Sequence, residues 1–465
     1  MKKSASRHRI SLIAILFALG ISRLVFAVNP FLPAWEYIPD GEPRVFGDRV
    51  YLYGSHDRAW QKAFCDKVLK VWSAPLTNLN EWHDHGISFS TIDISGHKSD
   101  VPYSRNYLYA PDVVENHGKY WLYAYIVGAP CAVGVSDIPD GPFKFVSEVK
   151  APAGTRKEFG GWGQYIDPGV LVDDDGKVYI YWGYKGSGMA QLNPTNMYEV
   201  LPNTFQPDII PTSAPFNFFE ACSPRKINGK YYLVYADGGK LVYAICDKPT
   251  GPFVYGGVIV QQGNGAPGGN IHGGLAQLNG QWFIFYHRMT HNTIFSRKAC
   301  AERVTIETDG SIKQVEQTSL GFETSLNPYR TTGAETACVL LGGNYVIEQD
   351  YENHPVILNR ACSLIGYKYF DFGPAVMKST LTFTANLRHG PAAGKIELWL
   401  DGWEEKTGKK IGALEIPAPE KIKDDWSKFF TTVSRVSGRH ALYFKFCGNG
   451  GKETICDLRS FEFQK

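Results

Sequence analysis

A strand–turn–strand pattern that recurs five times constrains the fold more than any other feature of the sequence. In each copy a turn glycine precedes an aromatic and β-branched strand, at residues 47–54, 118–124, 176–183, 229–236 and 280–287. The steps between the turn glycines are 71, 58, 53 and 51 residues. Hairpins at this spacing indicate units of about four strands, which is typical of a β-propeller. The sequence therefore predicts an all-β chain that begins with a five-bladed propeller; a generic all-β protein with frequent hairpins is the alternative.

An ionisable residue lies shortly before each of the turn glycines. These residues are Asp40, Asp112, Asp167, Glu220 and His272. The innermost strand of each propeller blade lines the central channel, so the five side chains are expected to converge on one axis. Carboxylates brought together raise one another's pKa. A place that concentrates such groups is a candidate site for acid–base chemistry.

Residues 1–27 have the pattern of a secretory signal peptide. Four lysine and arginine residues precede an apolar run at 10–21, and residues 25–27 form a small-residue cleavage site. An apolar run of this length is too short to span a bilayer. We therefore expect an exported protein, periplasmic or secreted, with no membrane anchor after removal of the signal peptide.

Charge and cysteine usage exclude several classes of function. Residues 1–27 hold five of the 48 lysine and arginine residues and none of the 46 acidic ones, so the remaining chain is nearly neutral. This balance makes nucleic acid an improbable partner. The nine cysteines include no CxxC pair, which argues against a zinc knuckle and against a redox motif. Cys447 and Cys456 are the first candidates for a disulfide in an exported chain.

The composition changes where the repeat stops. We assign residues 28–320 to the propeller and residues 321–336, rich in Thr, Ser, Gly, Asn and Pro, to a linker. Residues 337–465 contain alternating apolar and polar strands without a helical stripe. This pattern predicts a second domain with a β-sandwich fold.

An ordered set of motifs between residues 29 and 320 resembles glycoside hydrolase family 43. The set comprises Asn29-Pro30, the strand at 51–57, Tyr109-Ala110-Pro111-Asp112, Asp167-Pro168 and Phe219-Glu220-Ala221. Tyr109 stands where the family has tryptophan. The resemblance implies a five-bladed propeller that hydrolyses glycosides with inversion. It makes Asp40 the general base, Glu220 the general acid, and Asp167 the residue that orients the acid and raises its pKa.

The resemblance extends less closely to other positions. Asp112 is expected to contact substrate, with a purely structural role as the alternative. His272 is similar to a family histidine beneath the active site that faces a hydrated cation, which implies Ca²⁺ held through water. Arg297 corresponds to a substrate-contacting arginine, but its sequence context departs from the family pattern, and a surface salt bridge is the alternative. Independently, Trp162 lies in a glycine-rich loop where it could either stack on sugar or pack beneath the loop.

The C-terminal region resembles carbohydrate-binding module family 6. The segments that carry this resemblance are 369–373, 398–402 and 440–446, together with Gly412. Such modules hold sugar on aromatic rings and often carry a structural Ca²⁺. By this analogy Glu348 and Asp457 are the acids best placed to bind the ion. A domain that has lost its sugar site is the alternative.

These observations favour an inverting exo-glycosidase that releases α-L-arabinofuranose or β-D-xylose from plant cell-wall polysaccharides or oligosaccharides. Its chemistry requires no cofactor, and Ca²⁺ would be structural. An endo-arabinanase or a β-galactosidase on the same machinery is the second hypothesis. The third is a propeller that binds sugar without hydrolysing it. The three carboxylates argue against the third, because a lectin does not need a glutamate of raised pKa.

Overall fold

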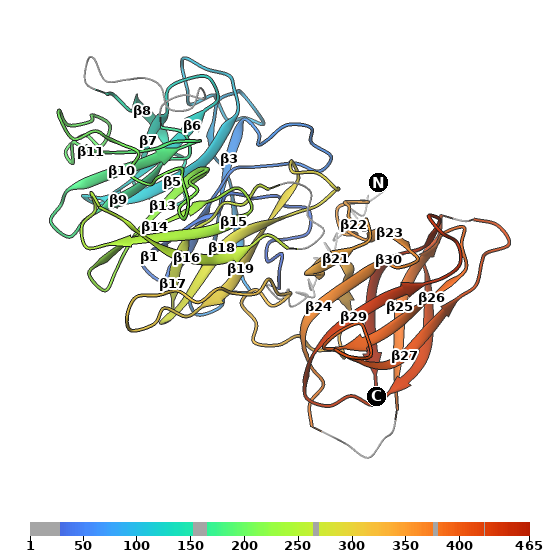
Figure 1. The fold of residues 1–465 in the computed structure, drawn as a ribbon. Helices are drawn as coiled ribbons and strands as arrows, with labels where there is room; N and C mark the ends of the chain where they lie inside the picture. Colours follow the sequence, from blue (N-terminus) through green and yellow to red (C-terminus); the bar gives the residue numbers. More distant parts are fainter. Residues whose placement is uncertain (1–27, 152–164, 264–268, 375–379, 423) are drawn as a thin grey trace, which may run out of the picture.

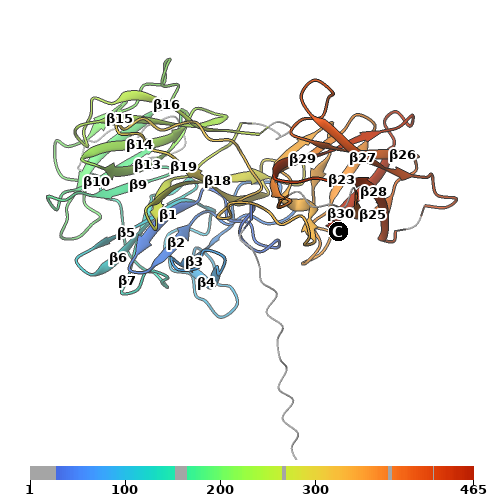
Figure 2. The same cartoon turned by 90° about the horizontal axis from the view of Figure 1, so that it is seen from below.

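The computed structural model describes residues 28–151, 165–263, 269–374, 380–422 and 424–465. These residues form strands, turns and one short 3₁₀ turn, η1 (Ala334–Thr336), and they include no α-helix. Figures 1 and 2 show two parts that lie side by side, a larger part coloured blue to yellow and a smaller one coloured orange to red. The all-β prediction is confirmed. Within the described ranges, no helix is long and apolar enough to cross a membrane.

The larger part contains five antiparallel sheets, four with four strands and one with three. The first comprises β1 (Glu42–Phe46), β2 (Arg49–Tyr53), β3 (Val68–Pro75) and β4 (His83–Ser90). The second comprises β5 (Leu108–Asn116), β6 (Lys119–Ile126), β7 (Ala132–Ser136) and β8 (Lys144–Glu148). The third comprises β9 (Gly169–Val172), β10 (Val178–Gly183), β11 (Ser187–Leu192) and β12 (Gln206–Pro207). The fourth comprises β13 (Glu220–Ile227), β14 (Lys230–Ala236), β15 (Lys240–Cys246) and β16 (Val254–Gln261). The fifth comprises β17 (Leu275–Leu278), β18 (Gln281–Met289) and β19 (Arg297–Val304).

The five predicted hairpins are the first two strands of these five sheets. Their registers are antiparallel in each case. The turn glycines have φ angles of 59°, 70°, 79°, 79° and 79° at Gly47, Gly118, Gly176, Gly229 and Gly280. This left-handed conformation is available to glycine without strain, which explains why the same residue type closes each hairpin. The hairpin prediction is therefore confirmed.

The first strands of the sheets are neighbours around a common centre. Strand β1 contacts β5, β5 contacts β9, β9 contacts β13, and β17 contacts β1. Arg225 of β13 connects to the remaining neighbour, because its Nε donates to the carbonyl of Leu275 in β17 at 2.7 Å. All five sheets therefore meet through the strands that carry or follow the ionisable residues singled out in the sequence.

A buried ionic network, formed by Glu42, Arg44, Asp112 and Arg225, fills this centre and is called the central network below. Arg44 donates to both carboxylate oxygens of Asp112 at 2.9 and 2.6 Å. Arg225 lies 2.5 Å from the Glu42 carboxylate. The Asp112 carboxylate also accepts the backbone N–H of Val170 in β9 at 2.7 Å. The central network thus joins strands β1, β5, β9 and β13.

The start of the described chain pairs with the last strand of the fifth sheet. Phe31 N–H donates to the Ala299 carbonyl at 3.2 Å. The Asn29 amide accepts from Ala301 N–H at 2.9 Å and donates to the Ala301 carbonyl at 2.8 Å. Residues 29–31 therefore cover the outer edge of β19, which a three-stranded sheet would otherwise leave exposed.

The smaller part contains two further antiparallel sheets. One has the order β22 (Tyr345–Val346), β23 (Val356–Arg360), β30 (Thr454–Gln464), β25 (Thr380–His389) and β28 (Ser427–Ser434), with β20 (Thr332–Gly333) also paired to β30. The other has the order β21 (Val339–Leu341), β24 (Leu364–Asp371), β29 (Arg439–Cys447), β26 (Gly394–Leu400) and β27 (Lys409–Ile416).

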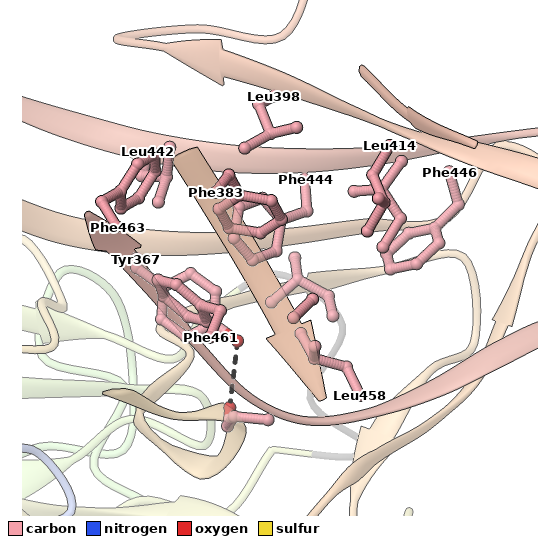
Figure 3. Close-up of a cluster of buried hydrophobic side chains, with 14 of the residues drawn as sticks. Tyr367, Phe383, Leu398, Leu414, Leu442, Phe444, Phe446, Leu458, Phe461 and Phe463 are labelled. Atoms are coloured by element: carbon pink, nitrogen blue, oxygen red, sulfur yellow. Dashed lines mark hydrogen bonds between the residues drawn. The ribbon is translucent and has the colours of Figure 1, made fainter. Parts of the chain in front are cut away.

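Side chains from both sheets of the smaller part pack into one core, shown in Figure 3. Phe383 and Phe461 come from the first sheet, and Tyr367 and Phe444 from the second. The ring centroids of Phe383 and Phe444 are 5.3 Å apart, and those of Tyr367 and Phe461 are 4.7 Å apart. Aromatic rings at these separations attract each other in addition to the hydrophobic gain from burial.

The proposed disulfide between Cys447 and Cys456 is wrong, because all nine cysteines are free thiols. Cys447 pairs with Lys395 across β29 and β26, whereas Cys456 pairs with His389 across β30 and β25. The two cysteines therefore belong to different sheets. Proximity in sequence suggested a bridge that the structure does not contain.

The central network generates a stability prediction. In Arg44→Met, Asp112 and Glu42 stay buried while losing a cationic partner, which is expected to lower the free energy of unfolding by about 3–5 kcal/mol. Urea denaturation followed by tryptophan fluorescence measures this loss. Lys98→Ala removes an exposed partner of Asp93 and is the matched control. Equal denaturation midpoints for Arg44→Met and the wild type would contradict a role for the network in holding the sheets together.

Candidate active site

Residues of the larger part line a cavity of about 120 Å³. Five of the predicted site residues line it, and they come from four of the five sheets or the loops beside them. They are Asp40, Asp167, Glu220, His272 and Arg297. The remaining lining residues are Phe64, Cys65, Tyr109, Ile166, Tyr184 and Asn270. The structure thus brings the three predicted catalytic carboxyl groups to one cavity.

The backbone is unusual at each of the three carboxyl residues. Asp40 and Asp167 have φ angles of 57° and 49° and lie just before β1 and β9. Glu220 is the first residue of β13, next to Ala221 with φ of 69°, and the register of β13 shifts immediately after it. Left-handed residues and strand irregularities are costly and often redirect a side chain at a functional site. The strand beginnings are therefore shaped to direct these side chains into the cavity.

Asp40 is held in its ionised form. Its carboxylate accepts from Ser55 Oγ at 2.7 Å and from the Arg297 guanidinium at 2.8 Å. Burial alone would raise the pKa of Asp40. The charge of Arg297, which is the largest opposing effect, and the Ser55 hydrogen bond outweigh burial, so the pKa lies below the ordinary value.

Arg297 is buried, with 2% of its surface exposed, which excludes the surface salt bridge considered above. Its guanidinium forms a fork with both carboxylate oxygens of Asp57, at 2.8 and 3.1 Å. It also donates to the Asn270 amide oxygen at 2.9 Å and lies over the ring of Phe64. Arg297 therefore holds Asp40 at the cavity and has Asp57 and Asn270 as further fixed partners.

The other two carboxyl groups retain protons. Burial, followed by the negative charge of Asp40, raises the pKa of Glu220 to about 7. Burial, followed by the charges of Glu220 and Asp40, raises the pKa of Asp167 well above its ordinary value. The cavity therefore contains one ionised carboxylate beside two protonated carboxyl groups at slightly acidic pH. Asp40, rather than Asp167, contributes the main charge that raises the Glu220 pKa.

Three residues that the sequence did not single out complete the site. Asn270 donates to Glu220 Oε1 at 3.0 Å while its amide oxygen accepts from Arg297, so it links the two carboxyl positions. Asp57 holds Arg297. His287 is fully buried, and its Nδ1 accepts the backbone N–H of Asp40 at 3.2 Å. Burial lowers the pKa of His287 to about 3, so the ring is neutral and its Nε2–H faces Asn270.

A sequence signal was present for some of these residues. Asn270 lies two positions before His272, and Asp57 follows the strand at 51–57 that carried the family resemblance. His287 ends the fifth hairpin run, where its side chain could equally be a core residue. Only the packing around Asp40 distinguishes these possibilities.

Two predicted substrate-binding residues do not join the described cavity. Asp112 is 1% exposed and belongs to the central network, with Arg44 and two backbone N–H groups as partners. Its environment supports the structural alternative. Trp162 lies outside the described residues.

Each predicted calcium-binding residue has protein partners in the described structure. Ca²⁺ takes six to eight oxygen ligands, and no group of three or more His, Cys, Asp or Glu side chains suited to a metal occurs among the described residues. His272 lies 3.9 Å from Asp40, and burial lowers its pKa. Asp457 accepts two hydrogen bonds from Arg388, and Glu348 accepts one from Tyr37. Glu348 and Asp457 thus have separate protein partners.

Comparisons with known proteins identify the family. Residues 29–312 match the model of glycosyl hydrolases family 43, and residues 334–465 match that of carbohydrate binding module family 6. The chain belongs to glycosyl hydrolase family 43. It is therefore a glycoside hydrolase, and its two matched regions agree with the two resemblances found in the sequence.

Relatives of this family match nearly the whole chain. A xylosidase/arabinosidase of Thermoclostridium stercorarium is 35% identical over 93% of this chain and 98% of the relative. An arabinoxylan arabinofuranohydrolase of Paenibacillus polymyxa is 26% identical over 92% of this chain and 72% of the relative. The solved structure of a family 43 arabinoxylan arabinofuranohydrolase from Bacillus subtilis has a TM-score of 0.55 and 24% identity. It covers 94% of this chain and 97% of its own, and it shows a shared fold.

The proton distribution generates a pH prediction. With the roles that the family resemblance implies, Asp40 as general base and Glu220 as general acid, hydrolysis requires ionised Asp40 and protonated Glu220. Activity should therefore fall as pH rises through the Glu220 pKa of about 7, because the acid loses its proton. The acidic limb should lie below the ordinary aspartate value of 3.8, because the Asp40 pKa is lowered. The pH profile of kcat/KM measures both limbs, and an activity maximum well above pH 7 would contradict this assignment.

Proposed function

We propose that the protein is an inverting exo-glycosidase that releases a pentose, α-L-arabinofuranose or β-D-xylose, from plant cell-wall polysaccharides or oligosaccharides. The observation that carries the proposal is the pairing, in one cavity, of a carboxylate kept ionised with a carboxyl group kept protonated. This difference in pKa is what an inverting glycosidase requires, because one group must give a proton while the other takes one.

In the proposed reaction Glu220 is the general acid and Asp40 the general base. Glu220 transfers its proton to the glycosidic oxygen as the bond to the anomeric carbon breaks. Asp40 removes a proton from the water that attacks that carbon from the opposite face. The product therefore has inverted configuration, which requires the two carboxyl groups to be separated by roughly 6.5–9.5 Å.

The neighbouring residues fit supporting roles in this reaction. Asp167 stays protonated beside the acid, since burial and the charges of Glu220 and Asp40 raise its pKa. Asn270 orients Glu220 through its amide N–H and is itself fixed by Arg297. Arg297 keeps Asp40 ionised, and its remaining contact surface faces the cavity, where it can contact substrate.

The substrate class rests on the relatives and on the shape of the cavity. Relatives matching almost the full chain are a xylosidase/arabinosidase and an arabinoxylan arabinofuranohydrolase. The cavity of about 120 Å³ is smaller than the 300–1,000 Å³ typical of sites for drug-sized ligands. A cavity of this size suits a single terminal sugar, which favours exo over endo action.

We also propose a domain architecture for the protein. Five sheets whose first strands meet at a centre support a five-bladed propeller over residues 28–320. A linker at 321–336 then leads to a β-sandwich at 337–465, supported by the single core between its two sheets. Residues 1–27, outside the described residues, would be the signal peptide of an exported protein.

The chemistry proposed here uses no cofactor. A structural Ca²⁺ remains a prediction that rests on the family resemblance alone. Chelation with EDTA is therefore expected to leave kcat unchanged and to lower the unfolding temperature if such an ion is bound.

Variants of the two carboxyl residues test the proposal. The mature protein should release nitrophenol from an arabinofuranoside or a xyloside, and Glu220→Gln and Asp40→Asn should each lower kcat by about 10²–10⁴-fold. With a dinitrophenyl leaving group, Glu220→Gln should recover activity, because the departing phenolate needs no proton. Asp40→Asn should not recover. Release of the sugar can be followed by NMR, which also reports its initial anomeric configuration.

Asp48→Asn makes the same chemical change at an exposed position between β1 and β2 and serves as the control. Wild-type protein that is inert on these glycosides, on arabinan and on arabinoxylan would contradict the proposed hydrolysis. Retained configuration in the first-formed sugar would contradict inversion.

A further inference from the structure

The interface between the two parts includes residues close in sequence to Asp40 and Arg297. Strand β22 and residue Glu348 of the C-terminal part contact His291, which lies between β18 and β19, six positions before Arg297. His291 N–H donates to the Val346 carbonyl at 2.7 Å, and Glu348 N–H donates to His291 Nε2 at 2.9 Å. Two hydrogen bonds thus join a single residue of the loop at 290–296 to the other domain.

The environment of the His291 ring determines its charge, and its hydrogen bonds determine which nitrogen carries the proton. Its ring is 6% exposed, and burial lowers its pKa to about 4, so the imidazole is neutral. Nε2 accepts from Glu348, and the ring proton therefore resides on Nδ1. Nδ1 lies 2.8 Å from Thr290 Oγ1, which in turn donates to the Ser296 carbonyl at 2.8 Å. Each donor in this series of hydrogen bonds meets an acceptor.

The series of hydrogen bonds continues from the loop into the active site. Thr290 N–H also donates to the Ser296 carbonyl at 2.9 Å, which closes the loop next to Arg297. Ser296 Oγ donates to the Arg58 carbonyl at 2.9 Å. Arg297 then donates to Asp57 and Asp40. Every step from Val346 to the proposed general base is therefore a direct contact between buried or partly buried groups.

Glu348 holds a second segment of the active site through its side chain. Its carboxylate accepts the hydroxyl proton of Tyr37 at 3.0 Å, and Tyr37 lies three residues before Asp40. The Tyr37 carbonyl accepts the N–H of Asp57, the partner of Arg297, at 2.9 Å. Lys298 Nζ lies 3.8 Å from the centre of the Tyr37 ring. One glutamate thus contacts both chain segments that position Asp40 and Arg297.

We propose that the C-terminal domain helps to position the active-site residues. Hydrogen bonds of Glu348 and His291 across the domain interface, called the interdomain clasp below, hold Arg297 against Asp40. Glu348 and His291 are positioning residues: neither lines the cavity. The inference rests on the proposed function, since it assigns the base role to Asp40. It gives Glu348 a role different from the calcium ligand expected from sequence.

Kinetics with small substrates test the clasp separately from any sugar binding by the C-terminal domain. With nitrophenyl glycosides, Glu348→Ala should lower kcat about fivefold to tenfold, because one buried hydrogen bond is lost, while KM stays within about twofold. Tyr37→Phe removes the same bond from its other end. It should have a similar effect, and the double variant should add little. His291→Ala should lower kcat further.

Conservative and matched variants separate positioning from general damage. Glu348→Gln keeps an oxygen that accepts from Tyr37 and should restore most of the activity lost in Glu348→Ala. Glu352→Ala changes an exposed glutamate of the same segment and should behave as wild type. A kcat within twofold of wild type for both Glu348→Ala and His291→Ala would overturn the clasp. Equal losses in Glu348→Gln and Glu348→Ala would overturn its hydrogen-bond basis.

Calorimetry provides a measurement that does not depend on activity. The full-length wild type should unfold in one transition, since polar groups on both sides of the interface are buried together, and His291→Ala should separate this into two. An unchanged single transition at the wild-type temperature would count against the clasp. If the wild type hydrolyses no glycoside, the proposed function fails, and the calorimetric result still decides whether the clasp exists.

Discussion

A buried guanidinium controls the charges of the active site. Arg297 is surrounded by Asp57, Asp40 and the Asn270 amide oxygen and has almost no contact with water. A charge removed from water is tolerated only where partners replace its hydration. Asp57 satisfies one side of the guanidinium through a fork, which leaves another N–H for Asp40. Without Arg297, three carboxyl groups in one cavity would compete for protons, and Asp40 would lose the partner that keeps it ionised.

The centre of the sheets therefore contains two sets of ionic contacts, which we describe as a lower and an upper layer. The lower layer is the central network, in which each carboxylate is matched by an arginine and no group remains for substrate. The upper layer has one arginine for three carboxyl groups that line the cavity. The same residue types stabilise the fold in one layer and retain protons in the other. Burial raises carboxyl pKa values in both layers, and the layer at the cavity has fewer cations to oppose that effect.

Sequence reasoning identified the strands and three of the carboxyl positions because hairpins repeat locally. A turn glycine and an alternating strand are properties of about ten consecutive residues, so they can be read without knowledge of the rest of the chain. The same reasoning treated Asp112 like Asp40, since both lie before a turn glycine. Their difference depends on Arg44, which comes from another sheet and pairs with Asp112 alone of the two. Contacts across sheets are not encoded in any local spacing.

Residues with unremarkable sequence neighbourhoods were missed for the same reason. His287 was part of a hairpin run, and its role depends on the Asp40 backbone N–H, which is 247 positions away in the chain. The cysteines near the end of the chain suggested a disulfide because they are close in sequence, yet adjacent strands in the chain entered different sheets. The odd number of cysteines is consistent with thiols used as small buried side chains.

The direction of the hydrogen bonds across the interface explains why a second domain could become part of the site. Val346 offers a carbonyl and Glu348 a backbone N–H, so His291 meets one acceptor and one donor at fixed spacing. Backbone groups of a strand segment cannot change rotamer, and they hold the histidine more rigidly than surface side chains would. Separation of the domains would leave His291 and Tyr37 without their partners in the C-terminal domain, in a region that is now buried. Because unpaired buried polar groups are costly, the interface favours a single arrangement of the domains. That arrangement of the domains also fixes the positions of the segments at 37–40 and 290–297.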